Sequence, residues 1–540
     1  MQKTDKEMIN ALPAKISALY ERLNDERAGQ LADIRAVKEH IYNTLTPYGK
    51  FRLPDIYEQA QTLKAHILES LSSHPEGLFD VFPADIKFSK SAKNQKAMLV
   101  SALENMKFTQ KLEDIVTDFV ECGESIVFIG WKRVFKKVRR AVDEDGKITF
   151  VSGSKLVYDG PSMRTISPEN FVFDTGADFE NAAKICRSKL TLREVLEDKN
   201  NNFLTPETVE ELKNLAAAKG ASQEGFKASS DTDKLDILEY WGDIKDESGK
   251  VLHNQLVIIA EKRYVIRFEG NPYLNCPFIY ANIIENPFTG RGMSPLRAAI
   301  DLNKAENEIL DTQLKAYSLI VNPPYLAPKG AFKGEQHVKP GKIIEYDSSL
   351  LPQMPTPLNF SQALCGWDFI RYFKGSIEST TGVFKTMAGE IEGETRTATE
   401  LNLTANGQSA RLNMLLDVIN RKIVVPVVQK TADIVSNFRF GTENLLCRVA
   451  GEYKNVEITD DVRFGDYIYR YSDRKAALER KRRESEIVNL MRAFGNAPQI
   501  AEKINWEECF KLALGALGVE NVDLYLKNGV SDVEKPEKAG

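Results

Sequence analysis

Apolar and polar residues alternate along this chain with two different periods, which separate helical segments from β-rich segments. The first part has a helical period, because Ile16, Leu19, Tyr20 and Leu23 fall on one face with charges between them. A β pattern follows in residues 124–160, which are rich in β-branched and aromatic residues and contain DEDG, a turn that predicts a hairpin. Short strands and two helical stretches come next. The first half of the chain is therefore predicted to belong to the α+β class.

A turn rich in glycine and proline introduces a long helix in the middle of the chain. In NPFTGRGMSP (286–295), Ser294 is placed to cap a helix, and Pro295 suits its first turn. The helix is expected to continue until NPP, where proline ends it. Its apolar stripe is predicted at Leu302, Ala305, Ile309 and Leu314.

Beyond this helix the sequence predicts a compact insert and a second helix. Residues 325–360 are rich in proline, glycine and short β runs. Helix resumes at about Gly366, with apolar residues at helical spacing: Phe369, Ile370, Phe373 and Ile377. The next stretch, TMAGEIEGETRT, has two glycines, three glutamates and no apolar face, so it is predicted to be an exposed loop.

The last third is predicted to contain a long helix, strands and a charged tail. Thr397 and Glu400 form a T-x-x-E capping box, which opens a helix that runs to about Phe438. Pro426 lies inside this helix and should kink it. Strands are expected at LLCRVAGEY and FGDYIYRY. In the first part of the chain, residues 72–83 are expected to form a loop.

Composition and charge narrow the possible classes of protein. With 540 residues, 42% hydrophobic and a net charge of −5, the chain is globular and has no global basic excess for tight binding of nucleic acid. Its apolar runs are far shorter than the ~20 residues of a membrane helix, and its first residues lack the pattern of a secretion signal. We therefore expect no membrane contact and folding in the cytoplasm.

The residue patterns of common catalytic and cofactor sites are absent from the sequence. The six cysteines form no C-x-x-C pair and the five histidines form no H-x-x-x-H pair, so buried free thiols are predicted and zinc is not. The phosphate-binding loop and the G-x-S-x-G elbow are also missing. Two acidic groups would suit Mg²⁺, namely residues 143–145 and the pair Asp460 and Asp461, although turn chemistry explains both. No cofactor and no catalytic residue are predicted.

Two basic runs are candidate contacts with DNA, capsid or neighbouring subunits. WKRVFKKVRR (131–140) has six basic residues, but a strand divides them between its two faces, so they cannot all follow one phosphate track. A solvated edge or a hairpin that contacts another subunit is the favoured interpretation. The second run, residues 480–483, alternates with glutamates and is expected to be an exposed, salt-bridged helix face.

The order of these segments resembles that of a tailed-bacteriophage portal, or head-tail connector, protein of the short-tailed-phage type. NPFTGRGMSPLRAAIDLNKAENE looks like the entry to a portal stem, and NPPYLAP looks like the entry to a clip. RTATELNLTANGQSARLNMLLDVINRKIVVPVVQ is similar to the long helix that follows the tunnel loop. TISPENFVFDTGADFENAAKICRSKLTLREVLE is similar to a wing segment.

The resemblance implies a portal fold with an α/β wing, a helical stem, a small β-containing clip, a long kinked helix and a helical crown. The implied boundaries are wing 1–292, descending stem helix 293–320, clip 321–365, ascending stem helix 366–384, tunnel loop 385–396, second wing part 397–473 and crown with tail 474–540. In a ring, neighbouring copies would bury the apolar stripes of the two stem helices. The expected stem-packing residues are Leu302, Ile309 and Phe373.

The resemblance also implies the function and the partners. Such a protein forms a ring, usually of twelve copies, at one capsid vertex of the virion, and it assembles in the host cytoplasm. Its channel passes double-stranded DNA loosely, while the large terminase ATPase, tail adaptors, and major capsid and scaffolding proteins dock on it. The expected tunnel-loop contacts with DNA are Lys385, Glu390, Glu392, Glu394 and Arg396.

Two alternatives stay open at this point. A metal-dependent nucleic-acid-processing enzyme of the virion would use Asp460 and Asp461. A tail adaptor or scaffold protein would usually be shorter and lack the helix, insert, helix core.

Overall fold

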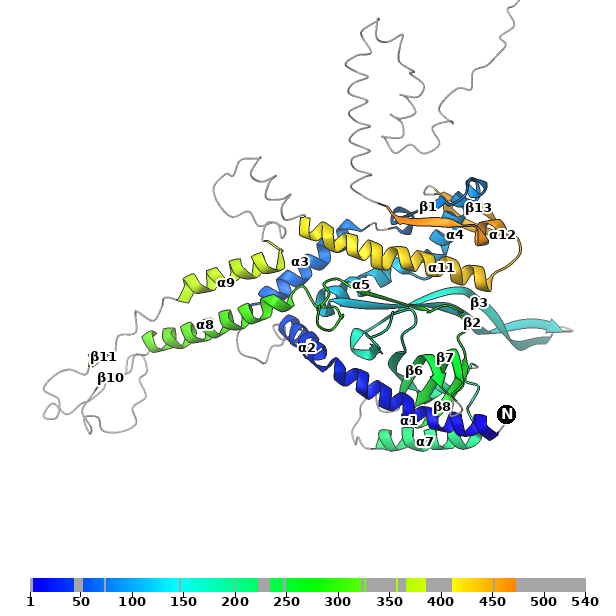
Figure 1. Cartoon of the computed structure of the whole chain (residues 1–540), viewed down its shortest axis with the longest axis horizontal. Coiled ribbons are helices and arrows are strands. Elements are labelled where there is room, and N and C mark those ends of the chain that lie inside the picture. Colours follow the sequence, from blue (N-terminus) through cyan, green and yellow to red (C-terminus); the bar gives the residue numbers. More distant parts are fainter. Residues whose placement is uncertain are drawn as a thin grey trace, which may run out of the picture. The chain divides into compact units, whose positions relative to one another are not determined.

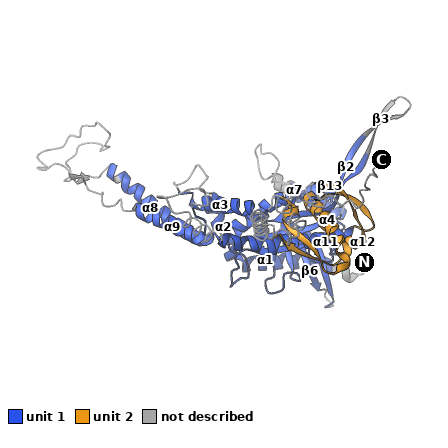
Figure 2. Ribbon diagram, turned by 90° about the horizontal axis from the view of Figure 1, so that it is seen from above, with its two compact units in different colours: residues 1–73, 105–438 blue, residues 74–104, 439–540 orange. Residues whose placement is uncertain are grey.

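The structure is a computed structural model of the chain. It describes residues 3–42, 52–71, 74–144, 147–198, 200–221, 234–245, 249–321, 325–326, 356–357, 366–384, 410–449 and 452–472. The chain divides into two compact units, of which unit 1 comprises residues 1–73 and 105–438 and unit 2 comprises residues 74–104 and 439–540 (Figure 2). Both units combine helices and strands, so the predicted α+β class is confirmed.

Unit 1 begins with helices, as the sequence predicts. They are α1 (Lys3–Glu26), α2 (Ala28–Tyr42), α3 (Asp55–Ser70) and α5 (Phe108–Cys122). The apolar face of α1 is the face predicted, since Ile16, Tyr20 and Leu23 are buried against a sheet and Leu19 is partly buried beside them. Burial of this stripe, at about 25 cal/mol per Å² of apolar surface, holds α1 in place.

The sheet against which α1 packs has five antiparallel strands in sequential order. They are β4 (Phe171–Phe173), β5 (Lys184–Thr191), β6 (Lys234–Lys245), β7 (Val251–Ala260) and β8 (Tyr264–Gly270). Alternate residues point to opposite faces, so Leu238 and Tyr240 contact α1 while Leu235 and Ile237 contact two other helices. Those helices are α6 (Leu192–Glu197), which begins with a Thr191–Glu194 capping box, and α7 (Pro206–Ala221).

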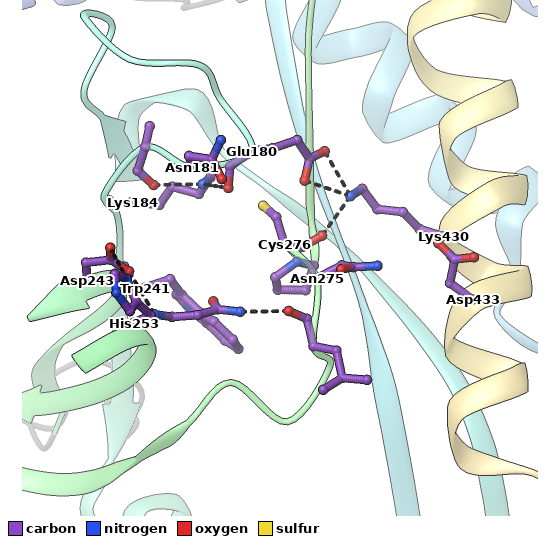
Figure 3. A pocket seen from close by; sticks show the side chains of 15 residues that line it. Glu180, Asn181, Lys184, Trp241, Asp243, His253, Asn275, Cys276, Lys430 and Asp433 are labelled. Atoms are coloured by element: carbon purple, nitrogen blue, oxygen red, sulfur yellow. Dashed lines mark hydrogen bonds and ion pairs between the residues drawn. The ribbon is translucent and has the colours of Figure 1, made fainter. Parts of the chain in front are cut away.

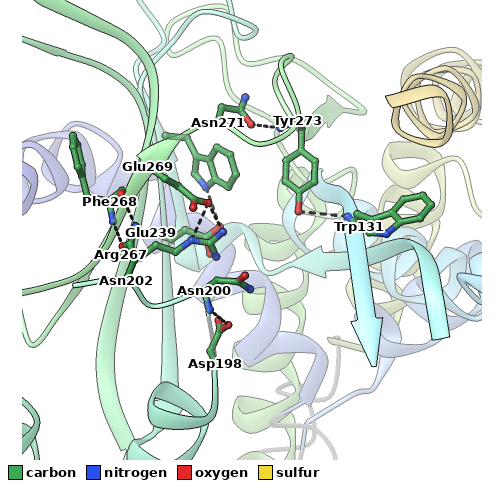
Figure 4. Close-up of polar contacts among 11 residues, drawn as sticks. Trp131, Asp198, Asn200, Asn202, Glu239, Arg267, Phe268, Glu269, Asn271 and Tyr273 are labelled. Carbon is green, nitrogen blue, oxygen red and sulfur yellow. Dashed lines mark hydrogen bonds and ion pairs between the residues drawn. The ribbon is translucent and has the colours of Figure 1, made fainter. Parts of the chain in front are cut away.

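Side chains close the free edge of this sheet. The Asn202 amide donates to the Phe268 carbonyl at 3.0 Å, and its oxygen accepts from the Phe268 N–H at 3.1 Å (Figure 4). One side chain thereby satisfies a donor and an acceptor of edge strand β8, as a paired strand would. Arg267 and Glu269 pair next to it.

A second sheet carries a long hairpin. Its order is β3 (Lys147–Ile166), β2 (Glu124–Glu144) and β9 (Phe278–Asn282), all antiparallel. The predicted hairpin is therefore confirmed, while β9, which follows β8 in sequence, pairs with β2 instead. Because β9 pairs only with residues 124–128, most of the hairpin extends from unit 1 as a two-stranded ribbon (Figures 1 and 2).

Two helices project from the opposite end of unit 1. They are α8 (Arg297–Val321) and α9 (Gly366–Thr381), which run side by side in opposite directions (Figure 1). In the insert that joins them, β10 (Tyr325–Leu326) pairs with β11 (Thr356–Pro357), and the remaining residues lie outside those described. Both helices occupy positions that the sequence predicts.

The long helix predicted in the last third is described from residue 410, and its expected start at Thr397 and Glu400 lies outside the described residues. At residues 420–424 it contains a π-helical turn, in which the Val425 N–H bonds to the Asn420 carbonyl, and α11 (Val425–Phe438) follows. Pro426 has no N–H to donate, and a proline ring clashes with the carbonyl four residues earlier. The backbone hydrogen bonds next to it therefore change from the α-helical to the π-helical pattern. The predicted irregularity at Pro426 is thus a π turn.

Unit 2 is built from segments far apart in sequence. It contains β1 (Phe79–Pro83), α4 (Ser91–Asn105), β12 (Glu443–Val449), β13 (Glu452–Ile458), α12 (Asp460–Phe464) and β14 (Tyr467–Tyr471), with single turns at Pro75–Gly77 (η2) and Ile86–Phe88 (η3). β1 pairs with β14, and β12 pairs with β13. The prediction of a loop over residues 72–83 was wrong for residues 79–83, because the partner strand that makes β1 a strand lies almost 400 residues away and cannot be found from local patterns.

Candidate functional site at the root of the helix pair

The turn that leads into α8 packs backbone to backbone against the end of α5. Gly123 ends α5 in a left-handed conformation, with φ of 80°. A Cβ on Gly123 would lie 2.0 Å from the Met293 carbonyl carbon, and a Cβ on Gly292 would lie 2.4 Å from the Gly123 oxygen. Larger residues would force the two segments apart, so glycine at both positions lets the turn before α8 contact the end of α5 directly.

Buried charges hold the same turn in place. Glu124 is fully buried, and its Oε2 accepts from the Tyr280 hydroxyl at 2.8 Å and from the Gly292 N–H at 3.0 Å. The Arg291 guanidinium lies 3.8 Å from Glu124 Oε1, stacks over the Phe173 ring and donates to the Phe173 carbonyl. Burial lowers the pKa of Arg291, and the negative charge of Glu124 partly offsets this decrease. Each charge therefore depends on the other for its compensation.

A second buried arginine joins the first two helices to this region. Arg27, between α1 and α2, donates to the carbonyls of Pro168 at 2.7 Å, Phe171 at 2.8 Å and Glu169 at 2.7 Å. Burial and the positive charge of Arg291 lower the pKa of Arg27 to about 10. Three backbone acceptors keep the guanidinium charged at neutral pH, since they replace the water that it loses.

Ser294 makes the capping contact that the sequence predicts. Its hydroxyl donates to the Val120 carbonyl of α5 at 2.6 Å and accepts from the Leu296 N–H at 3.1 Å. One hydroxyl therefore satisfies an orphan carbonyl at the end of α5 and an orphan N–H at the start of α8. This contact joins the start of α8 to the end of α5.

Two carboxyl groups share a buried position where α3, α8 and α9 meet. Glu306 is fully buried and Asp55 nearly so, and Lys374 Nζ lies 3.1 Å from Asp55 Oδ1. Asn303 donates to Glu306 Oε2 at 3.2 Å. Burial and the neighbouring Asp55 raise the pKa of Glu306 to about 8, so folding favours the protonated form of this carboxyl group. With Lys374, this pair ties both helices of the projecting pair to α3.

The outer half of the helix pair exposes large apolar side chains. They are Leu314, Tyr317 and Val321 on α8, and Trp367, Phe369 and Tyr372 on α9, with exposed fractions between 47% and 68%. Large apolar side chains exposed along one part of a molecule indicate a surface that contacts other molecules.

A polar cavity of about 520 Å³ lies between α11 and the loops of the five-stranded sheet (Figure 3). Lys430 on α11 donates to Glu180 Oε1 at 3.0 Å and to the Cys276 carbonyl at 2.7 Å. Lys184 donates to the carbonyls of Ala182 at 2.8 Å and Glu180 at 3.2 Å, and burial lowers its pKa. The protein itself thus supplies partners for both ammonium groups, and those of Lys430 join α11 to the loops beside the sheet.

The residues expected to pack in the stem lie on α8 and α9. Leu302, Ile309 and Phe373 are all half-buried within one copy of the chain. The most buried apolar face of α8 is rotated from the predicted stripe, and it contains Ala299, Ile300, Leu310 and Ala316. Leu314, which the sequence placed in the stripe, is 47% exposed.

The five residues expected in the tunnel loop lie outside the described part of the chain. They are Lys385, Glu390, Glu392, Glu394 and Arg396. Their proposed role in DNA contact stays a prediction.

The acidic pair considered for Mg²⁺ starts a helix. Asp460 Oδ1 lies 3.3 Å from Arg463 Nη1 and accepts from the Gly441 N–H at 3.2 Å, which is the arrangement of a structural helix terminus. The pair lies between strands β13 and β14, and Asp460 and Asp461 are the first residues of α12. Within the described ranges, His, Cys, Asp and Glu side chains nowhere come together in threes around a possible metal position.

The predicted free thiols agree with the structure where it is described. Cys122, Cys186, Cys276 and Cys447 are all free, and only Cys276 is less than fully buried. Burial raises the pKa of Cys186 to about 12, which makes this thiol unreactive at neutral pH. Cys365 and Cys509 lie outside the described residues.

The sequence did not single out Gly123, Glu124 or Glu306, which contribute most to this region. Arg291 lies in the NPFTGRGMSP segment (286–295), but the sequence around it does not indicate that its side chain is buried. A glycine on both sides of a charged residue is the one signal that points to close backbone packing there.

Comparison with known proteins identifies one family. The family described as phage SU10 portal protein matches residues 141–460, which is more than half of the chain. No curated protein matches the sequence. In the described part of the chain, helices that are long and apolar enough to cross a bilayer are absent.

Proposed function

Because the chain belongs to the family of the phage SU10 portal protein, we propose that it forms a closed ring at one vertex of a phage capsid. The ring would be a channel for genome packaging and ejection, and a platform on which terminase and tail proteins dock. The observation that carries this proposal is the family match over residues 141–460, which includes the hairpin end, both projecting helices and α11.

The exposed apolar residues of the helix pair support assembly into a ring. Within the described part of one copy, six large apolar side chains of α8 and α9 are exposed. Neighbouring copies in a ring would cover them, because each copy presents the same surface and a closed ring leaves none unpaired. We propose twelve copies by analogy with portal proteins in general.

We assign the parts of the ring by the same analogy. Residues 1–292 and 397–473 would form the wing, residues 293–320 and 366–384 the stem, and residues 321–365 the clip. Residues 385–396 would form the tunnel loop and residues 474–540 the crown and tail. The turn at Gly292 and Ser294 would then transmit force between wing and stem, since it has two glycine contacts and a buried ion pair.

The charge of the chain suits a channel that passes DNA without holding it. Twelve copies of a chain with net charge −5 would carry about −60, which repels a polyanion. Each phosphate neutralised by a cation adds an attraction that translocation must break. We propose that Lys385 and Arg396 contact the DNA backbone briefly, while Glu390, Glu392 and Glu394 prevent lasting contact.

The proposed partners follow from this role. A separate terminase ATPase would supply the energy for packaging, in agreement with the missing phosphate-binding loop in this sequence. Tail adaptors would dock on the clip, and major capsid and scaffolding proteins would surround the wing. The protein would assemble in the host cytoplasm and remain in the virion as a structural component without catalysis.

Negative-stain microscopy of the purified full-length protein tests the central proposal. We expect closed rings with a central hole, and a solution mass that is a fixed multiple of 60.8 kDa. Leu302→Asp and Ile309→Asp should prevent ring formation while circular dichroism shows a folded wing, because both side chains lie half-buried on α8. A monomer at all concentrations, or intact rings in both variants, would contradict this assignment of the stem.

The tunnel loop is tested separately by packaging. The double variant Lys385→Ala with Arg396→Ala should form rings but change DNA retention in a packaging assay. Unchanged retention and packaging would refute the proposed phosphate contacts and leave the ring itself unaffected.

A further inference from the structure

The ribbon formed by β2 and β3 carries an apolar spot far from the core of unit 1. From Gly130 onward β2 pairs with β3 alone, and the ribbon points away from the rest of unit 1 (Figures 1 and 2). A two-stranded hairpin by itself is marginally stable in water, so a ribbon of this length generally rests on a further surface.

A bulge gathers the apolar residues on one face of the ribbon. The register shifts between Val134 and Phe135, so Leu156 and Val157 both lie opposite Phe135. These three side chains are 59% (Phe135), 44% (Leu156) and 52% (Val157) exposed. Single exposed apolar residues are ordinary, but three together at one bulge on an extended arm indicate a contact surface.

Basic residues surround this spot on the same face. Arg133, Lys137 and Arg139 alternate with Phe135 along β2, so strand geometry places them on its side, and Lys136 points to the other side. Asp159 pairs with Arg133 at 3.1 Å. Lys137 has no ion pair within the ranges that the structure describes, and it is exposed. The face is therefore apolar at its centre and positive around it.

The same chain offers a surface of opposite charge. α6 and α7 share a core beneath them, which brings their outer faces together. Those faces expose six carboxylates, namely Glu194, Glu197, Asp198, Glu207, Glu210 and Glu211. Among the described side chains of these two helices, Arg193 and Lys213 are the only basic residues, and Arg193 already pairs with Glu197 at 2.9 Å. Leu196, which is 39% exposed, adds an apolar contact.

We propose that the Phe135 face of the ribbon docks on the α6–α7 surface of a second copy of this chain. The occupant is a protein surface and not DNA. Phosphates would bind the lysines and arginines, but they would not bury the three exposed apolar side chains. The contact combines a desolvated apolar centre with a complementary charged rim, which sets orientation between copies. The proposal rests on the ring assembly proposed above and specifies one contact within it.

Site-specific photocrosslinking of the full-length protein tests the contact. Phe135 is replaced by p-benzoylphenylalanine, which keeps an aromatic ring at the bulge, and assembled protein is irradiated with and without a DNA fragment. We expect a covalent dimer in which mass spectrometry joins residue 135 to residues 192–221 of another copy. Crosslinks to DNA, to the same chain or to a different surface would overturn the proposal.

Adjacent lysines provide a matched control. Lys137→Glu, on the docking face, should lower the dimer yield severalfold, and Lys136→Glu, with the same change on the opposite face, should leave it unchanged. Adding Glu207→Lys and Glu210→Lys to Lys137→Glu should restore the crosslink. Equal loss in both lysine variants would show a general effect of charge and would overturn the assigned face.

The outcome also separates this contact from ring formation. Rings without the crosslink would refute the docking and leave the proposed function intact. Protein that forms neither rings nor crosslinks would refute both.

Discussion

Trp131 of β2 stacks on Phe438 of α11, with ring centroids 5.1 Å apart and planes 9° from parallel. Tyr273 adds to the contact, because its hydroxyl accepts from the Trp131 N–H at 3.4 Å (Figure 4) and its ring lies 5.9 Å from Phe438. The stack joins the base of the hairpin to the last turn of α11. The elements that leave unit 1 as the ribbon are therefore fixed at their root by aromatic packing.

Trp131→Ala should weaken this junction. The loss of the stack costs about 1 kcal/mol beyond the area that the indole buries, so the urea midpoint should fall measurably. Trp131→Phe keeps an aromatic face against Phe438 and should recover much of the loss. Equal midpoints for the Ala and Phe variants would show that the stack contributes nothing.

Gly292→Ala should destabilise the root of α8. Its Cβ would lie 2.4 Å from the Gly123 oxygen, which is backbone and cannot rotate away. We expect a loss of several kcal/mol or insoluble protein. Gly375→Ala is the control, because its Cβ meets nothing within 4 Å and alanine favours the interior of α9 by about 0.5–1 kcal/mol. Unfolding midpoints that move in the same direction for both variants would argue against the close-contact explanation.

Glu124→Gln should be far more costly than the loss of a surface ion pair. The substitution leaves Arg291 buried without a counter-charge, which typically costs about 3–5 kcal/mol. Glu197→Gln removes the exposed pair with Arg193 and should cost less than about 1 kcal/mol. Denaturant unfolding of the two variants compares them directly. A small effect at Glu124 would mean that the hydrogen bonds from Tyr280 and Gly292, not the charge, hold the turn.

The carboxyl pair at α3, α8 and α9 predicts how stability depends on pH. Glu306 has a pKa raised from 4.5 to about 8 in the folded protein, so folding favours its protonated form. Its stabilising contribution is fully present below pH 4.5 and is lost as the pH rises through 8. Glu306→Gln has no carboxyl group to titrate. The free energy of unfolding of this variant should therefore fall less with rising pH, by an amount on the order of a few kcal/mol.

Unfolding midpoints between pH 5 and pH 9 measure this effect. Asp118→Asn is the useful comparison, since burial raises the pKa of Asp118 to about 7 and its effect has the same sign with an earlier onset. The two variants should therefore flatten different parts of the curve. A profile in Glu306→Gln that is identical to wild type would show that Glu306 is ionised in the folded protein.

Much of the architecture could be predicted because it depends on residues that are close together in the sequence. The helical stripe of α1, the hairpin with its turn, the cap at Ser294 and the proline in α11 each depend on residues a few positions apart. Local spacing fixes which face of a helix or strand is apolar, and hydrophobic burial then makes that face the inner one. The motifs around residues 286–295 and 396–429 also carried the resemblance to portal proteins, and the family match bears this out.

Only the tertiary structure decided which distant residues meet. β1 became a strand because β14 pairs with it, and Gly123 requires its glycine because Met293, 170 positions later, touches it. The raised pKa of Glu306 needs Asp55 beside it and the loss of water around both, neither of which a sequence pattern records. Desolvation and close packing depend on everything that surrounds a group in space, so these properties arise only when the chain has folded.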